Sequence, residues 1–347
     1  MLLVLGLAAA LWGLGALLGT PQRLRWGMIG LLWVGVVALH LILPAGHALR
    51  QATGESAAPW LLLGGAAALV LAYRAGLRAL RRRARAPDRE AKKGLFSEAE
   101  LDRYARHIVL REIGGPGQKA LKEARVLVIG AGGLGSPALL YLAAGGVGTI
   151  GVIDADVVEN SNLQRQVLHR DADIGRPKVQ SAAEAMAAQN PAVRVRPYQR
   201  RLTQEIAEGL FSDYDVILDG TDNFETRYLS NAAAVAAGRP LVSGALSQWE
   251  GQLSIFDPKR GTPCYQCVFP EAPAAGLAPS CAEAGVLGPL PGVLGAMMAA
   301  ETIKLITGAG TPLLGEMLIH DALFGETRKF TLSRRADCPV CGGGTAG

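Results

Sequence analysis

The chain has 347 residues, of which 50% are hydrophobic and 19% are charged, and its formal net charge at pH 7 is +5. A mean hydropathy of +0.23 together with this charge predicts a membrane segment joined to a soluble domain, with the basic excess gathered beside the membrane. No groove-reading or base-stacking motif accompanies the basic residues, which excludes the nucleic-acid-binding classes of protein.

The first 86 residues contain three apolar runs, which predict transmembrane helices at residues 2–19, 26–43 and 59–80. The first run carries no charge, and the only ionisable side chain of the second is His40. The third contains Arg74 and Arg78, so a re-entrant or interfacial helix is an alternative for it. A secretory signal is excluded for the first run, because that run has no basic leading segment and is longer than a signal core.

The arginines predict the orientation of this membrane segment. Arg23 and Arg25 lie in the first loop, and four more arginines follow the third run, at positions 81, 82, 83 and 85. The positive-inside rule therefore predicts a multi-pass protein of the cell inner membrane with its C-terminal domain in the cytoplasm. Residues 87–95 are predicted to be a linker, and 96–347 to be one large α/β domain.

A helix is predicted to begin at Ser97, because Glu100 follows three residues later in a capping-box pattern. This helix carries Arg106. We consider Arg106 a candidate functional residue, and the alternative is that it is an ordinary exposed arginine on the helix surface.

A strand, a glycine-rich turn and a helix are predicted over residues 125–144. The run RVLVIGAGGLG ends in Gly130, Gly132, Gly133 and Gly135, whose backbone N–H groups can approach phosphate at a helix N-terminus. Asp154 follows the next strand, residues 149–153, and is placed to accept a ribose hydroxyl. A tight turn without a ligand is the alternative.

Several polar and charged side chains lie between residues 156 and 222. Together they favour a binding site for a nucleoside triphosphate over one for a dinucleotide cofactor. Asn162, Arg165 and Lys178 supply polar and cationic groups, and Asp156 and Asp222 supply carboxylates. Asp222 comes after a strand at residues 215–218, where open α/β sheets bind ligands, and a carboxylate beside phosphates indicates magnesium. Each cation taken alone would be explained by surface solvation.

Four of the five cysteines form two C-x-x-C pairs, Cys264 with Cys267 and Cys338 with Cys341. Four thiolates in two such pairs suit tetrahedral zinc, although the long gap between the pairs leaves disulfides open. Cys281 is unpaired and follows a loop rich in proline, alanine and glycine, so a nucleophilic role and an inert one are both open.

Further strands are predicted at residues 193–197, 240–245, 251–256 and 316–319, the last two in an antiparallel extension where a protein substrate can dock. A core helix is predicted at residues 291–307. His107, His169 and His320 lack ligand spacing and are interpreted as structural or surface residues.

From about residue 96 to residue 341 the chain resembles the MoeB/ThiF/HesA family of adenylyltransferases, relatives of the ubiquitin-activating enzymes. The resemblance rests on RYARHIVL at 103–110, GAGGLGS at 130–136, DAD at 154–156, SNLQRQ at 161–166, GRPK at 175–178, GTDN at 220–223, CYQC at 264–267, SCAEAGV at 280–286 and CPVC at 338–341. Within the family the MoeB branch, the molybdopterin-synthase adenylyltransferases, is the most similar.

The resemblance implies a Rossmann-like, mostly parallel sheet with an antiparallel extension, and adenylylation of the C-terminal glycine of a ubiquitin-like sulfur carrier. It implies ATP and Mg²⁺ at a site formed by Gly130, Gly132, Gly133, Gly135, Asp154, Asp156, Ser161, Asn162, Leu163, Gln164, Arg165, Lys178, Thr221, Asp222 and Asn223. It further implies a structural zinc on the four paired cysteines, and a homodimer in which Arg106 reaches the neighbouring site. Cys281 matches a family cysteine that acts covalently in some relatives.

Sulfur is expected to come from a separate sulfurtransferase or cysteine desulfurase, because little sequence follows Cys341. The expected carrier is the small subunit of molybdopterin synthase, and the carrier of the thiamine pathway is the alternative. Two hypotheses from other functional classes stay open. Under these hypotheses the protein is either a membrane oxidoreductase linked to NAD or FAD, or a non-catalytic scaffold that binds a ubiquitin-like protein.

Overall fold

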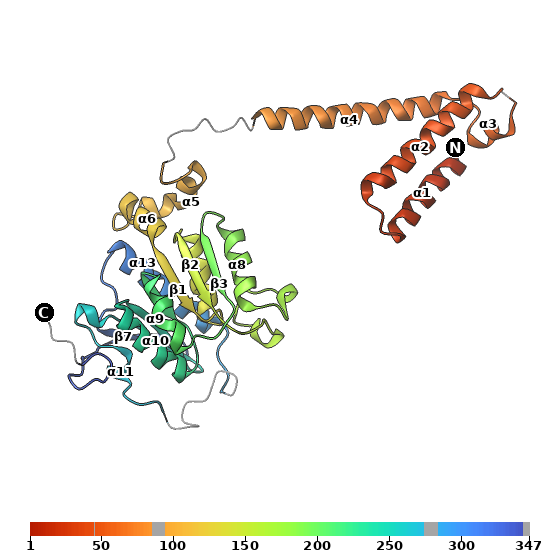
Figure 1. Ribbon diagram of the computed structural model, residues 1–347. Coiled ribbons are helices and arrows are strands. Elements are labelled where there is room, and N and C mark those ends of the chain that lie inside the picture. Colours follow the sequence, from red (N-terminus) through yellow and green to blue (C-terminus); the bar gives the residue numbers. More distant parts are fainter. Residues whose placement is uncertain (45, 85–93, 274–283, 343–347) are drawn as a thin grey trace. The chain divides into compact units, whose positions relative to one another are not determined.

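The computed structural model describes residues 1–44, 46–84, 94–273 and 284–342, with the backbone alone for 78–84 (Figure 1). The chain divides into two compact units, Met1–Lys92 and Lys93–Gly347. The predicted linker at residues 87–95 lies almost entirely outside the described residues.

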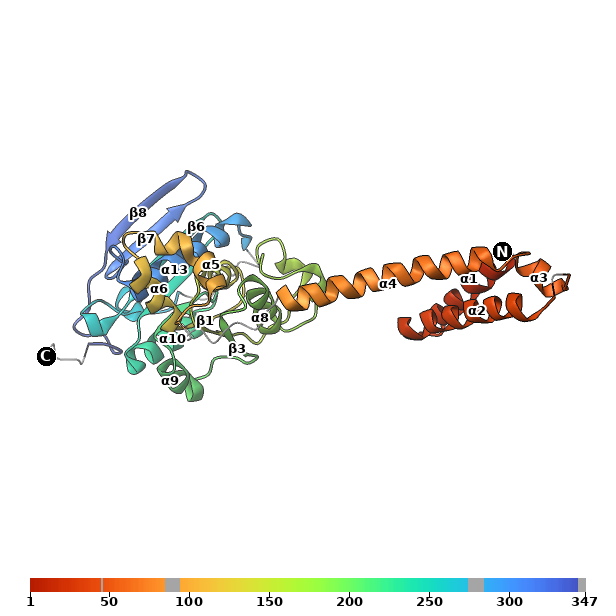
Figure 2. The ribbon, with the colours of Figure 1, turned by 90° about the horizontal axis from the view of Figure 1, so that it is seen from above.

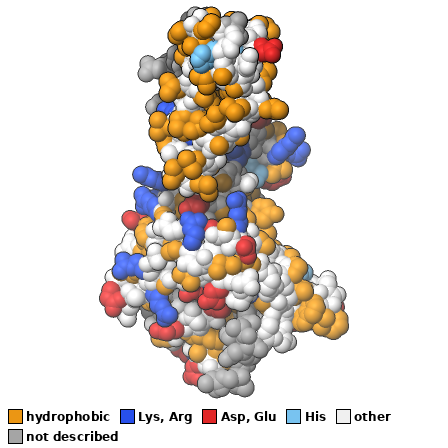
Figure 3. Space-filling view, turned by 90° about the vertical axis from the view of Figure 1, so that its right-hand side faces the viewer, with side chains coloured by type: hydrophobic (Ala, Val, Ile, Leu, Met, Phe, Trp, Pro, Cys, Tyr) orange, Lys and Arg blue, Asp and Glu red, His pale blue; other side chains and the backbone are white. Residues whose placement is uncertain are grey.

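The first unit consists of helices α1 (Leu2–Leu17), α2 (Gln22–Ile42), α3 (Ala48–Thr53) and α4 (Ala58–Ala84). By length and composition, α2 and the Ala58–Leu77 part of α4 are able to cross a membrane, whereas α1 is shorter. Their apolar side chains are mostly exposed, and Figure 3 shows hydrophobic side chains over the visible surface of these helices. All three predicted apolar helices are therefore present, and their crossing of a bilayer stays a prediction. The short helix α3 was not expected.

A small interior joins three of these helices. Val4, Val36 and Trp60 are each less than a tenth exposed and pack together. The Trp60 indole N–H donates to the Thr53 carbonyl at 3.1 Å, and the Thr53 hydroxyl lies 3.0 Å from Nε2 of His40. His40, the one ionisable side chain of its apolar run, is thus paired inside the unit, as buried polar groups generally are.

One sheet of eight strands forms the centre of the second unit, in the spatial order β3-β2-β1-β4-β5-β6-β7-β8. The strands are β1 (Arg125–Ile129), β2 (Thr149–Ile153), β3 (Arg194–Tyr198), β4 (Val216–Asp219), β5 (Leu241–Leu246), β6 (Glu250–Phe256), β7 (Glu316–Asp321) and β8 (Glu326–Thr331). In this order the five strands β3, β2, β1, β4 and β5 pair in parallel, and β5–β6, β6–β7 and β7–β8 are antiparallel pairs. Figure 2 shows β7 and β8 at the end of the antiparallel part. The α/β class with a mostly parallel sheet and an antiparallel extension is therefore confirmed.

Helices cover both faces of the sheet, because alternate residues of its central strands point to opposite sides. Val126 and Val128 of β1 belong to the larger core, under α7 (Gly135–Ala144), α8 (Lys178–Gln189) and α13 (Pro289–Thr307). Leu127 and Ile129 belong to the smaller core, under α9 (Gln204–Ser212) and α10 (Phe224–Ala237). The carboxyl ends of the parallel strands consequently meet at one edge between two layers of helices.

The remaining helices close the ends of the unit: α5 (Glu98–Ile108), α6 (Gly114–Glu123) and the short α11 (Tyr265–Val268). The capping box at the start of α5 is confirmed, because the Ser97 and Glu100 side chains each accept a backbone N–H. The predicted core helix at 291–307 is also confirmed as α13, in which Leu294 and Met298 are fully buried. Helix α13 is apolar and long enough for a membrane span, yet 44% of that stretch is buried inside this unit.

Candidate functional site

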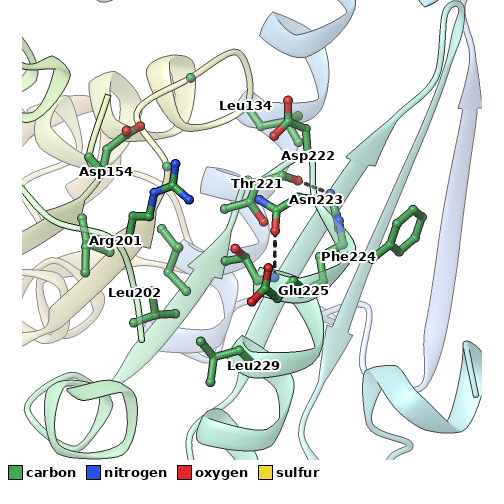
Figure 4. Close-up of a pocket in the computed structure, with 18 of the residues that line it drawn as sticks. Leu134, Asp154, Arg201, Leu202, Thr221, Asp222, Asn223, Phe224, Glu225 and Leu229 are labelled. Atoms are coloured by element: carbon green, nitrogen blue, oxygen red, sulfur yellow. Dashed lines mark hydrogen bonds between the residues drawn. The ribbon is translucent and has the colours of Figure 1, made fainter. Parts of the chain in front are cut away.

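A cavity of about 1410 Å³ opens at the carboxyl ends of the parallel strands, the edge at which open α/β sheets bind ligands. Figure 4 shows Asp154 and Arg201 on one side of it and Thr221, Asp222 and Asn223 on the other. The predicted site residues that line it are Gly130, Gly132, Gly133, Asp154, Asp156, Asn162, Arg165, Lys178, Thr221, Asp222 and Asn223. Residues spread over nearly a hundred positions of sequence thus meet at one place.

The glycine-rich turn forms the floor of this cavity. Gly130 has a φ of 90°, a left-handed conformation that favours glycine, and its N–H donates to the Ile153 carbonyl at 2.9 Å. A Cβ atom on Gly135 would lie 1.9 Å from the Gly130 carbonyl oxygen, so only glycine fits there. The turn is therefore tight enough to place α7 directly behind Gly132 and Gly133.

Asp154, which directly follows β2, holds this turn. One carboxylate oxygen accepts the Ala131 N–H at 2.8 Å, and the other accepts the Asp156 N–H at 2.8 Å. The side chain is half-buried at the cavity wall. Each carboxylate oxygen keeps a second lone pair, so the side chain can accept a ribose hydroxyl while it holds the turn.

Arg165 lies over the turn. Its guanidinium donates to the Ser161 carbonyl at 3.0 Å, and its Cδ lies 3.9 Å from the position of a Cβ atom on Gly133. Asn162 is 8% exposed, and its side-chain oxygen accepts the Glu159 N–H at 3.3 Å. The cation is therefore placed beside the glycine backbone by the short helical turn Asn160–Asn162.

Lys178 is a buried cation of the cavity wall, with 6% exposure, and it is the first residue of α8. Its Nζ atom lies 2.9 Å from Oδ2 of Asp156, and its backbone N–H donates to the Asp156 carbonyl at 2.9 Å. A buried ammonium needs a paired charge, and Asp156 supplies it from a side chain that is 64% exposed. Asp156, predicted to contact the nucleotide, is thus also the residue that fixes Lys178.

The loop after β4 brings Thr221, Asp222 and Asn223 to the opposite wall. The Asn223 side chain accepts the Thr226 N–H at 2.8 Å and caps α10. Asp222 is exposed to the cavity, and no hydrogen bond or ion pair engages its carboxylate within the described residues. That carboxylate is free to take a ligand.

Buried groups behind this loop set its position. Arg227 is 5% exposed and donates to the carbonyls of Thr221 and of Gly244, the latter at 2.8 Å. Asp219 is fully buried, and its Oδ1 accepts the Thr221 hydroxyl at 2.6 Å. Since both groups clamp Thr221, the following residue Asp222 projects from a fixed point.

Sequence reasoning missed several residues that line the cavity. Arg200 and Arg201 follow β3, and Gln166 lies beneath Gly132, 4% exposed and with an unpaired side-chain oxygen among the described residues. Tyr265 also lines it, and burial raises the pKa of this phenol to about 12, so it is neutral at pH 7. In the sequence, the two arginines can be recognised only as residues that follow a strand. This assigns them to the cavity only when β3 is known to pair with β2.

Other predicted residues do not line the cavity. Gly135 is buried under the turn, and the Ser161 hydroxyl donates to Glu159 at 3.3 Å, so Ser161 contributes through its carbonyl alone. Leu163 is half-buried, and the side chain of Gln164 lies against Gly288. Cys281 lies outside the described residues. Arg106 is exposed in the last turn of α5 and does not reach this cavity.

The cavity has no ready cage of acidic ligands for magnesium. Within the described ranges, the one group of three or more metal-ligating residues is the cysteine cluster. Mg²⁺ is commonly held by one or two carboxylates together with substrate phosphates. The free carboxylate of Asp222 fits that mode of binding.

The four paired cysteines converge, as the zinc prediction requires. The Sγ atoms of Cys264, Cys267, Cys338 and Cys341 all lie within 4.8 Å of one another and are buried. The Cys264–Cys338 and Cys267–Cys341 separations are 3.5 and 3.4 Å, too long for the roughly 2 Å disulfide bond and near the roughly 3.8 Å edge of a tetrahedral zinc thiolate site. Burial raises the pKa of the Cys264 thiol, so the ionised form of this thiol needs a cation beside it. The donor set fits zinc.

Comparison with known proteins gives one family. A profile described as the ThiF family matches residues 104–340. A Thermus thermophilus protein named sulfur carrier protein adenylyltransferase is 50% identical over 251 residues, which cover 71% of this chain and 93% of that protein. The probable adenylyltransferase/sulfurtransferase MoeZ of Mycobacterium tuberculosis is 53% identical over 70% of this chain and 63% of its own length.

Other similar proteins are longer than this chain or share only its fold. The mouse adenylyltransferase and sulfurtransferase MOCS3 is 48% identical, and the match spans 55% of that protein. The crystal structure of E. coli MccB with ATP has a TM-score of 0.58 at 24% identity, covering 65% of this chain and 69% of MccB. The likeness to MccB supports the fold alone.

Proposed function

This chain belongs to the ThiF family, and from that premise we propose that it uses ATP to adenylylate the C-terminal glycine of a ubiquitin-like sulfur carrier. An adenylyltransferase activity agrees with the names of its relatives from Thermus, Mycobacterium and mouse. The observation that carries the proposal is the convergence of the glycine turn, Arg165, Lys178 and Asp222 on one cavity.

The proposed reaction joins a carboxylate to a phosphate. A carboxylate oxygen of the carrier's last glycine forms a bond to the α-phosphorus of ATP, the bond from that phosphorus to the bridging oxygen breaks, and pyrophosphate leaves. Both reactants are anions, so their approach is unfavourable unless positive groups are already in place. Arg165 and Lys178 supply such charges from positions fixed by Ser161 and Asp156.

The other groups orient the nucleotide. Gly132 and Gly133 present backbone to phosphate, and Asp154 accepts a ribose hydroxyl with the lone pairs that the turn leaves unused. Asp222 would hold Mg²⁺, which supplies Lewis-acid stabilisation of phosphate charge when bound. The cavity volume of about 1410 Å³ leaves room for a peptide tail beside the nucleotide.

The proposed carrier is the small subunit of molybdopterin synthase, and the thiamine-pathway carrier is the second candidate. MoeZ and MOCS3 carry adenylyltransferase and sulfurtransferase in their names, and this chain spans 63% and 55% of those proteins. We propose that a separate sulfurtransferase or cysteine desulfurase provides the sulfur. Cys281 is a candidate for covalent chemistry with the carrier.

We further propose a homodimer in the inner membrane with the catalytic unit in the cytoplasm. Arg106 is exposed and does not line the cavity of its own chain, which supports a role in a second copy. The exposed apolar helices α2 and α4 and the arginines around them support the membrane assignment and its orientation.

The test uses the full-length protein in lipid nanodiscs with each purified carrier, ATP and Mg²⁺. Carrier-dependent exchange of labelled pyrophosphate into ATP, with an adenylated carrier C-terminus detected by mass spectrometry, is the expected result. Exchange with one carrier and not the other identifies the substrate. The absence of exchange with every glycine-ended carrier of the native cell, or a bound flavin or nicotinamide absorbance, contradicts the proposal.

A further inference from the structure

Two buried side chains, His169 and Ser181, connect the glycine turn to helix α8, and the half-buried Asp173 lies beyond them. His169 is 6% exposed, and its Nε2 atom lies 2.9 Å from the carbonyl oxygen of Ala131, inside the turn. Its Nδ1 atom lies 2.8 Å from the hydroxyl of Ser181 on α8. The Ser181 hydroxyl in turn lies 2.8 Å from Oδ2 of Asp173. The imidazole ring thus joins a residue 38 positions earlier in the chain to the layer of helices.

The partners decide where the hydrogens lie. A carbonyl oxygen only accepts, so Nε2 of His169 must carry a hydrogen and donate it to Ala131. Burial lowers the pKa of His169, and nearby Lys178 lowers it further, against opposing effects of the Ala131 carbonyl and of Asp173 and Asp154. The ring is therefore neutral at pH 7 with its one hydrogen on Nε2, and Nδ1 carries only a lone pair. The adjacent Ser181 hydroxyl donates its single hydrogen to Oδ2 of Asp173.

Asp173 completes the network from the other side. Burial alone would raise its pKa, but hydrogen bonds from Ser181, from the Arg170 backbone and from Arg176 together hold that pKa below its usual value. The carboxylate and Nδ1 therefore compete for the single hydrogen of the Ser181 hydroxyl. Protonation of Nδ1 would supply a second hydrogen and satisfy both partners at once.

The contact with Ala131 has a consequence on the cavity side of the same peptide. In a planar trans peptide the C=O of one residue and the N–H of the next point in opposite directions. His169 holds the Ala131 carbonyl toward the interior, so the Gly132 N–H points the other way, and Gly132 lines the cavity. Within the described residues the Gly132 N–H has no acceptor. Asp154 fixes the preceding peptide through the Ala131 N–H at 2.8 Å.

We propose that His169 is a positioning residue for the nucleotide: its Nε2–H fixes the Ala131–Gly132 peptide so that the Gly132 N–H faces a phosphate oxygen. This inference rests on the proposed binding of ATP at the glycine turn. The Ser136 hydroxyl is a second, longer donor to the same carbonyl, at 3.2 Å, so His169 shares the task but supplies the shorter bond.

Two substitutions separate this role from simple packing. In His169→Gln the side-chain amide can place its N–H near the position of Nε2, so the donor to Ala131 is retained and the link to Ser181 is lost. In His169→Asn the amide reaches only the position of Nδ1, so the link to Ser181 is retained and the donor to Ala131 is lost. Both variants remove the ring, and both should lose similar thermal stability.

The experiment measures the dissociation constant for ATP and the KM and kcat of carrier-dependent pyrophosphate exchange, using full-length protein in nanodiscs. His169→Asn is expected to weaken ATP binding and raise the KM for ATP by about three- to tenfold, the size of one net hydrogen bond. His169→Gln should stay within about twofold of wild type. Adding Ser136→Ala to His169→Asn should weaken binding further, and adding it to His169→Gln should do so less.

The outcomes distinguish this inference from the proposed function. Wild-type protein that fails to bind ATP or to exchange pyrophosphate overturns the proposed function. Active wild-type protein with equal ATP affinity in both His169 variants overturns the positioning role alone. A loss of ATP affinity in His169→Gln that equals or exceeds the loss in His169→Asn overturns it as well.

Discussion

The ammonium of Lys178 lies 2.9 Å from the carboxylate of Asp156, and the lysine is 6% exposed while the aspartate side chain is 64% exposed. The cation is thus held at the cavity wall by a partner that water can still reach. An arriving phosphate can therefore share the ammonium without leaving either charge buried and unpaired. Preorganised cations of this kind stabilise a transition state because they need no rearrangement at the moment of reaction.

Lys178→Met tests that arrangement. We expect carrier-dependent pyrophosphate exchange to fall by about 10²- to 10³-fold, the usual loss for one preorganised charge or donor. Lys119→Met is the matched control, because Lys119 is exposed on α6 and its one ion pair among the described residues is with Glu123, at 3.9 Å. Equal rates in the two variants would show that Lys178 stabilises structure rather than phosphate.

Asp222→Asn tests the magnesium role. The substitution keeps the shape of an exposed side chain and removes its negative charge, so exchange should be lost while carrier binding, measured by surface plasmon resonance, is preserved. Asp213→Asn, at the end of α9 and outside the cavity, should behave as wild type. Unchanged exchange in Asp222→Asn at limiting Mg²⁺ would contradict the assignment.

Elements with a strong local pattern could be predicted from sequence. Strand β2 has the predicted limits, 149–153, and β3 to β7 differ from prediction by a few residues at most, because buried apolar runs bounded by turn residues identify a strand directly. Strand β8 was missed, since all six of its residues are exposed and ETRKFT has no apolar face. Its place depends on pairing with β7, which is a property of the tertiary structure.

The candidate site was predictable to the same extent. The glycines, Asp154, Lys178 and Asp222 follow strands or begin helices, so their places follow from local sequence once the sheet is assumed to be parallel. Arg201 was missed because the strand order, not the local sequence, brings it to the cavity. His169 was interpreted as structural, and its contact with Ala131 is visible only in the folded chain.

Gly135→Ala tests the closeness of the glycine turn. A methyl group at Gly135 would lie 1.9 Å from the backbone oxygen of Gly130, so the turn or α7 must move, and we expect a loss of about 3 kcal/mol in the free energy of unfolding. Gly132→Ala is the control, because its nearest neighbour would be Nε2 of Gln166 at 3.6 Å, an ordinary contact. The measurement is thermal unfolding of both variants. Equal melting temperatures would contradict the close approach of Gly135 to the Gly130 carbonyl oxygen.

Cys264→Ser tests the zinc site. Zinc content measured by mass spectrometry should fall from one equivalent per chain toward zero, and the protein should lose much of the roughly 10 kcal/mol that a structural zinc contributes. Cys281→Ser is the control, since Cys264, Cys267, Cys338 and Cys341 already supply the four thiolates of a tetrahedral site. A Cys264→Ser variant that keeps one zinc per chain would remove Cys264 from the ligand set.

The lowered pKa of His169 predicts a dependence of stability on pH. The unfolded ring binds a proton near pH 6.5, whereas the folded ring, desolvated by burial, binds it only at lower pH. Between these two pKa values the unfolded state holds more protons, so the stability supplied by the neutral ring is complete above pH 6.5 and is lost as the pH falls toward the folded pKa. His169→Gln has no titrating ring at this position.

The measurement compares melting temperatures of wild type and His169→Gln in nanodiscs from pH 7.5 to pH 5. Groups that do not interact with His169 titrate alike in the two proteins, so the difference between their melting temperatures reports His169 together with its neighbour Asp173. As the pH falls below 6.5, the melting temperature of the wild type should decrease more than that of the variant. Parallel curves would mean that the ring gains its proton as easily in the folded chain as in water, which would contradict the lowered pKa of His169.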